Sequence, residues 1–138
     1  MASVKKPAGY SGTPLIAKLG IKAGARAQGL NPPADFAETL GSLPARVTLV
    51  SRGSLDFGMF FVTRKTDLVK RFLGLRNRLA SDGMLWISWP KRSSGAPTDL
   101  TENVIRAVGL ELGLVDVKVC AVDGTWSGLK FVRRLSDR

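Results

Sequence analysis

The 138-residue chain contains no histidine. Histidine is the side chain that most often works as a general base near neutral pH, and it is also a common zinc ligand. Its absence excludes a Ser-His-Asp triad, a Cys-His pair and every histidine-ligated metal site in this chain. A single cysteine, Cys120, likewise excludes an internal disulfide and a cysteine-rich metal cluster. Because Cys120 lies in an apolar run at residues 117–122, we expect a small buried hydrophobe.

Long apolar runs are also missing. The longest, near residues 59–62 and 84–87, are far shorter than the roughly 20 residues that a transmembrane helix needs. Residues 1–19 contain two prolines and two glycines before Leu15, in place of the apolar centre of a signal peptide. We therefore expect a cytoplasmic protein with no membrane contact.

Acidic residues are scarce beside basic ones. The chain has 21 Lys and Arg against 11 Asp and Glu, for a formal charge of +10. Such a surface attracts phosphates, but the cations are scattered with no run longer than two, which is typical of ordinary solvated charge. Nucleic-acid binding is the alternative, because one predicted helix carries five cations: Lys65, Lys70, Arg71, Arg76 and Arg78. Arg71 and Arg78 are one heptad apart and share a face.

The remaining composition is that of an ordinary folded domain. Hydrophobic residues make up 44% of the chain and charged residues 23%. A chain of this length can bury one core. We expect a leader at residues 1–12, rich in Lys, Gly, Ser and Pro, followed by a single α/β domain at residues 13–138.

Hydrophobic periodicity and turn residues predict ten elements. Helices are expected at residues 14–19, 34–40, 65–80 and from Thr98 or Asp99 to 112. Strands are expected at residues 25–30, 46–51, 57–62, 84–89, 115–122 and 128–135. Thr13 reads as the first helix cap, Asp99 with Glu102 as a capping box, and Asp123-Gly124 as a hairpin turn.

The order of these elements indicates the fold. Strands that alternate with helices favour a mostly parallel sheet covered on both faces, and the last two strands add an antiparallel hairpin. We therefore predict a Rossmann-like α/β three-layer sandwich.

Several strings resemble the bacterial family called domain of unknown function 3052. They are residues 9–15 (GYSGTPL), 89–91 (WPK), 98–102 (TDLTE), 113–116 (GLVD), 118–123 (KVCAVD) and 125–129 (TWSGL). The resemblance covers nearly the whole chain and implies a domain without implying an activity.

More distantly, the element order and residues 19–24 (LGIKAG) are similar to class I S-adenosylmethionine-dependent methyltransferases. That resemblance implies methyl transfer with S-adenosylmethionine as cofactor. Such enzymes need a glycine-rich loop after the first strand and an acidic residue at the end of the second. This chain has residues 29–33 (GLNPP) and 51–53 (SRG) there. We therefore predict no cofactor and a degenerate, non-catalytic relative, with the methyltransferase as an alternative.

The loop at residues 90–99 is the candidate site, because open α/β sheets bind ligands beyond the carboxyl ends of their strands. Its cations, its backbone N–H groups and the helix expected at Asp99 suit a phosphate or carboxylate, and Trp89 could stack on a planar ligand. The alternative is that the cations are solvated and that Asp99 is a helix cap. The candidate ligand-binding residues are Trp89, Lys91, Arg92, Ser94, Gly95, Thr98 and Asp99, with Asn31, Ser11 and Thr13 as neighbours.

Two other tryptophans need an interpretation. Trp86 lies inside a predicted strand and is expected in the core. Trp126 lies at the hairpin and is a candidate rim or interface residue. The sequence thus predicts a binding or regulatory domain for an anion or nucleotide.

Overall fold

The computed structural model describes residues 13–138, so the predicted leader and Ser11 lie outside the described residues. The central feature is a six-stranded sheet with the order β2-β1-β3-β4-β6-β5. Its strands are β1 (Arg26–Leu30), β2 (Thr48–Leu49), β3 (Leu55–Phe61), β4 (Leu79–Pro90), β5 (Leu114–Ala121) and β6 (Trp126–Arg133). The pairs among β1 to β4 are parallel, and β6 runs antiparallel to both β4 and β5.

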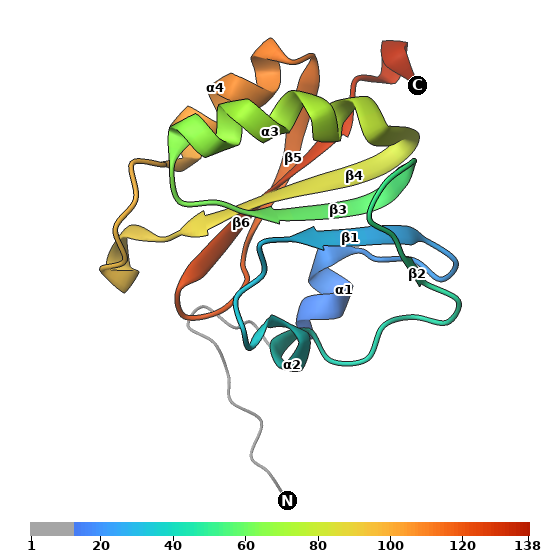
Figure 1. Ribbon diagram of the computed structural model, residues 1–138, viewed down its shortest axis with the longest axis horizontal. Helices are drawn as coiled ribbons and strands as arrows, with labels where there is room; N and C mark the ends of the chain where they lie inside the picture. Colours follow the sequence, from blue (N-terminus) through green and yellow to red (C-terminus); the bar gives the residue numbers. More distant parts are fainter. Residues whose placement is uncertain (1–12) are drawn as a thin grey trace, which may run out of the picture.

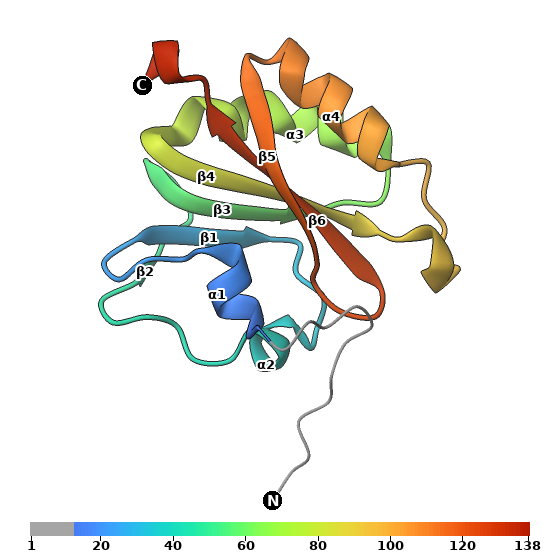
Figure 2. The same ribbon diagram turned by 180° about the vertical axis from the view of Figure 1, so that it is seen from behind.

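Helices cover both faces of this sheet (Figures 1 and 2). The short helices α1 (Leu15–Leu19) and α2 (Phe36–Leu40) lie on one face. The longer helices α3 (Lys65–Arg78) and α4 (Glu102–Glu111) lie on the other. Two 3₁₀ turns, at Arg92–Ser94 and Leu135–Asp137, complete the element list. The predicted element order and the three-layer sandwich with a C-terminal antiparallel hairpin are confirmed.

Each face of the sheet has its own apolar core. Under α3 and α4, Phe72 and Phe131 meet edge to face with ring centroids 5.3 Å apart. Under α1, the fully buried Trp86 donates its indole N–H to the Leu19 carbonyl over 2.9 Å, as the core interpretation of this residue expected. That carbonyl ends a five-residue helix and would otherwise lack an intrahelical partner.

Some predicted boundaries were wrong. The first helix has Pro14 at its N-cap position with no side-chain bond, so Thr13 does not cap it. The strand expected at residues 46–51 is the two-residue edge strand β2. Asp82 and Gly83 do not form a turn but lie inside β4. They belong to a β-bulge: Leu55 pairs with Leu79 and Phe57 with Met84, so β4 has more residues than β3 between these two pairs. The bulge therefore contains the residues that the sequence pattern assigned to the end of a helix and to a turn.

The helix expected at Asp99 begins at Glu102. Its cap is Thr101, whose hydroxyl accepts a hydrogen bond from the Val104 N–H at 3.2 Å. Asp99 instead caps α3, because its Oδ1 accepts a hydrogen bond from the Lys65 N–H at 2.8 Å. A carboxylate suits that position, since the first N–H groups of a helix have no intrahelical acceptor and carry partial positive charge.

Candidate functional site

The predicted anion loop uses most of its polar groups internally. The Ser94 hydroxyl donates to the Lys91 carbonyl at 2.7 Å and accepts from the Ala96 N–H at 3.2 Å. The N–H groups of Ser94 and Gly95 donate to loop carbonyls, and the Lys91 N–H donates to Thr125. These internal bonds leave fewer N–H groups for an anion than the sequence suggested.

The second half of this loop is tied to α3. The Thr98 hydroxyl donates to the Thr63 carbonyl at 2.6 Å and accepts from the Leu100 N–H at 3.0 Å. With Asp99 on the first N–H of α3, both predicted ligand residues already have partners in the protein. Only the cations Lys91, half-buried, and Arg92, exposed, remain as predicted anion contacts.

The other predicted site residues and Trp126 differ in their exposure. Trp89 is 6% exposed and belongs to the core beneath α3 and α4, so little of its ring is left for a ligand to stack on. Asn31 is exposed and has a left-handed backbone with φ of 54°, and Thr13 is exposed. Trp126 is half-buried, and its role at a rim or interface stays a prediction.

An aromatic cluster occupies the carboxyl ends of the strands. Phe61 at the end of β3 meets Phe36 of α2 with centroids 4.8 Å apart and Trp126 of β6 with centroids 5.2 Å apart. Both contacts are edge to face, the geometry that aromatic pairs prefer in packed cores. Sequence reasoning missed this cluster, because its three members lie on separate elements.

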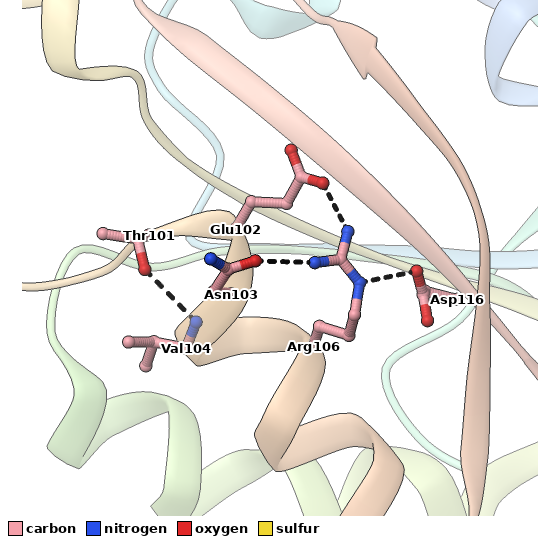
Figure 3. A network of polar contacts seen from close by, with 6 residues as sticks. All are labelled: Thr101, Glu102, Asn103, Val104, Arg106 and Asp116. Carbon is pink, nitrogen blue, oxygen red and sulfur yellow. Dashed lines mark hydrogen bonds and ion pairs between the residues drawn. The ribbon is translucent and has the colours of Figure 1, made fainter.

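The start of α4 carries a polar network centred on Arg106 (Figure 3). The guanidinium donates to Asp116 at 2.8 Å, to Asn103 at 2.8 Å and to Glu102. These carboxylates raise the pKa of Arg106, chiefly through the hydrogen bond that it donates to Asp116 and then through the one that it donates to Glu102. The network joins α4 to β5, and it contains both ion pairs that the described residues form with one another.

Three lysines lie on the α1 face of the sheet, and one of them, Lys22, also lines a hollow with Asp56 and Asp82. Lys118 of β5 and Lys130 of β6 stand directly opposite each other in the antiparallel pair. Burial lowers the pKa of Lys130, and the positive charges of Lys118 and Lys22 lower it further. We call Lys22, Lys118 and Lys130 the lysine cluster. Like charges opposite each other on neighbouring strands are destabilising, so this arrangement has a cost that the fold alone does not require.

The backbone of α1 supports one side of the lysine cluster. The Lys118 Nζ donates to the Lys18 carbonyl at 2.8 Å, at the carboxyl end of α1. The Lys130 Nζ lies 3.9 Å from the point where a Cβ on Gly20 would stand. Sequence reasoning missed the cluster, since 108 positions separate Lys22 from Lys130 and only the folded sheet sets Lys118 opposite Lys130.

The basic helix α3 uses part of its charge structurally. The Arg76 Nε donates to the Leu112 carbonyl at 3.1 Å, and the Arg78 Nε donates to the Gly53 carbonyl at 2.8 Å. The Arg71 guanidinium lies 6.0 Å from the centroid of the Phe60 ring. Arg71 and Arg78 thus each have a contact within the protein, and nucleic-acid binding by this helix stays a prediction.

Two further features were sought in the described residues: a metal-binding group and a membrane-spanning helix. Across residues 13–138 there is no group of three His, Cys, Asp or Glu side chains that could hold a metal ion. Within the same residues, no helix has both the length and the apolar content needed to cross a membrane.

Comparison with solved structures identifies the class of fold. The chain is similar to a SAM-dependent methyltransferase from Aquifex aeolicus, with a TM-score of 0.58 and 14% identity over 85% of this chain and 86% of that one. It is also similar to the ribosomal protein L11 methylase from Lactobacillus delbrueckii subsp. bulgaricus, with a TM-score of 0.57 and 14% identity over 87% and 75%.

A third similar structure is the fibrillarin of Aeropyrum pernix in complex with natively bound S-adenosyl-L-methionine. Its TM-score is 0.57, with 13% identity over 90% of this chain and 70% of that one. The chain therefore has a Rossmann-like, methyltransferase-type fold. No protein-family model and no curated protein sequence matches it, so the resemblance to domain of unknown function 3052 is not confirmed.

The residues of this chain do not suit S-adenosylmethionine as that fold usually holds it. After β1, the tight glycine turn is replaced by Asn31 and two prolines, and residues 50–54 after β2 contain no carboxylate for the ribose hydroxyls. The aromatic cluster fills part of the edge at which the strands end. The fold is that of the methyltransferases, while the expected cofactor contacts are missing.

Proposed function

We propose that this chain is a non-catalytic binding domain on a methyltransferase-type fold, and that its ligand carries a phosphate group held by the lysine cluster. The observation that carries the proposal is that Lys118 and Lys130 stand directly opposite each other on β5 and β6. The positive charge of Lys22 also lowers the pKa of the Lys130 amine. A phosphate between these amines converts repulsion into attraction, and charge-assisted hydrogen bonds to phosphate are short and strong.

The test is a thermal unfolding series with pyrophosphate, using chloride at matched ionic strength as the reference. We expect pyrophosphate to raise the Tm by several degrees, because a ligand that binds only the folded state stabilises it by mass action. Lys130→Met should abolish most of that rise. Lys70→Met, which removes the same charge from the exposed side of α3, should keep it.

Two results would overturn the proposal. One is an equal Tm rise in chloride of the same ionic strength, which indicates screening alone. The other is a full pyrophosphate response in Lys130→Met.

The loop cations Lys91 and Arg92 remain a second proposed contact for an anion. Their double replacement by Met should leave the pyrophosphate response unchanged if the lysine cluster is the site. A response lost in that variant and kept in Lys130→Met would assign the anion to the loop instead.

A second candidate function is S-adenosylmethionine-dependent methyl transfer. The observation in its favour is the likeness to several methyltransferase structures, including one with S-adenosyl-L-methionine bound. Titration calorimetry with S-adenosylmethionine tests it directly. Heat of binding that fits a single site would favour this function, and we expect none at micromolar protein concentrations.

A further inference from the structure

Helices α3 and α4 leave an apolar groove on the outside of the molecule. It has a volume of about 560 Å³, and its apolar lining comes from Val69 of α3 and from Val104, Ala107, Val108 and Leu112 on α4 or at its end. Val69 is 53% exposed, and Leu73, one turn further along α3, is 49% exposed. Neighbouring exposed apolar side chains of this kind mark interaction surfaces more often than scattered single ones.

The two ends of the groove carry opposite charges. Lys65, the first residue of α3, lines one end, and Glu111, the last residue of α4, lines the other. The two helices run in the same direction across the sheet, so these charges lie at opposite ends of the helix pair (Figures 1 and 2). Within residues 13–138, neither the Lys65 amine nor the Glu111 carboxylate has a hydrogen-bond or ion-pair partner.

Both charges are placed against the helix dipole. Cations are favoured at the carboxyl end of a helix and anions at the amino end, yet Lys65 stands at the start of α3 and Glu111 at the end of α4. Their positions therefore do not stabilise the helices to which they belong. They do give the groove a positive end and a negative end.

We infer that this groove is the interface of a symmetric homodimer. A second copy related by a twofold axis in the interface, perpendicular to the line from Lys65 to Glu111, places its α3 and α4 across the first pair in the opposite sense. Each Lys65 then faces Glu111 of the other copy, and the exposed apolar side chains cover one another. A twofold interface repeats every contact, so the dimer contains two ion pairs between Lys65 of one copy and Glu111 of the other.

The charge pattern selects a second copy over another occupant. An unrelated helix needs only the apolar strip, whereas this groove adds a cation at one end and an anion at the other, and an inverted copy meets them with an anion and a cation. Antiparallel packing also sets the positive ends of one helix pair beside the negative ends of the other.

The test is a charge exchange followed by sedimentation velocity across a range of protein concentrations. The unmodified chain should sediment as a dimer at tens of micromolar. Lys65→Glu and Glu111→Lys each place like charges face to face twice per dimer, so each should weaken dimerisation by about tenfold or more. The double variant Lys65→Glu/Glu111→Lys should restore it.

Control variants separate this effect from a general change of charge or a loss of folding. Arg52→Glu and Glu38→Lys make the same charge changes outside the groove and should leave dimerisation unaltered. Val69→Asp should give a folded monomer, because the side chain is exposed in the single chain; circular dichroism checks the fold.

A monomer at all concentrations would overturn the inference. So would a dimer that is insensitive to both single exchanges, or one that the double exchange fails to restore in folded protein. None of these results bears on phosphate binding, because the lysine cluster lies on the opposite face of the sheet.

Discussion

Gly109 of α4 lies against Phe131 of β6 so closely that a Cβ at Gly109 would stand 2.2 Å from Cε1 of the ring. Phe131 is fully buried and contacts Phe72 of α3. The close approach of α4 to the sheet therefore depends on the missing side chain. Any larger residue must push the ring or the helix away.

Replacing this glycine tests the close approach. Gly109→Ala should lower the free energy of unfolding by about 1–3 kcal/mol, because overpacking outweighs the helix propensity that alanine adds. Gly74 of α3 is the matched control, since a Cβ there would meet nothing within 4 Å. Gly74→Ala should stabilise by roughly 0.5–1 kcal/mol. Urea unfolding measures both, and equal effects of the two changes would contradict the close contact.

A second prediction concerns the two helix caps near residue 100. Asp99→Ala and Thr101→Ala should each cost about 1 kcal/mol, the usual value of an N-cap bond. Their local effects should differ, because Asp99 binds the Lys65 N–H of α3 while Thr101 binds the Val104 N–H of α4. Hydrogen exchange should quicken at the start of α3 in the first variant and at the start of α4 in the second. Faster exchange at the start of α4 in Asp99→Ala would mean that Asp99 caps α4, as the sequence suggested.

These caps illustrate what the sequence could and could not predict. The hairpin at Asp123 was predictable because its bonds are local: Asp123 Oδ1 accepts from the N–H groups of Thr125 and Trp126, two and three residues on. The bond from Asp99 to Lys65 spans 34 residues and has no local signature. Asp99 followed by Glu102 resembles a capping box, and only tertiary packing assigns the carboxylate to the other helix.

The candidate sites follow the same division. The sequence located the loop at residues 90–99 correctly as the connection after β4, but it could not show that Ser94 and Thr98 bond within the protein. The lysine cluster depends on the register between β5 and β6, which shifts between Asp116 and Lys118. A slip of one residue would turn Lys118 to the other face of the sheet, so alternation alone could not pair it with Lys130.

Cys120 provides a prediction about reactivity. Burial raises the pKa of its thiol, and this effect exceeds the opposite influence of Lys18 and Lys118. Since the thiolate is the nucleophile, iodoacetamide at pH 8 should modify the native protein more slowly than the protein unfolded in urea. Mass spectrometry follows the reaction. Faster modification of the native state would mean that the neighbouring lysines outweigh burial.

The last prediction uses the pH dependence of Lys130. Its pKa in the folded protein is lowered by burial, then by Lys118 and Lys22, so the unfolded chain holds this proton more tightly. Stability therefore rises with pH between the lowered folded pKa and the unfolded value of 10.5, where the unfolded state binds more protons.

Removing the amine should remove that dependence. In chloride at pH 7, Lys130→Met should be more stable than the unmodified protein by about 0.5 kcal/mol, the scale of a cross-strand pair. Its advantage should shrink as the pH approaches 10.5, while Lys70→Met should show neither the gain nor the trend. Pyrophosphate should reverse the order at pH 7, because only the unmodified protein retains the amine that the bound anion neutralises. Urea unfolding in both salts measures the difference, and a variant less stable than the parent in chloride would show that Lys130 already has a favourable partner within the fold.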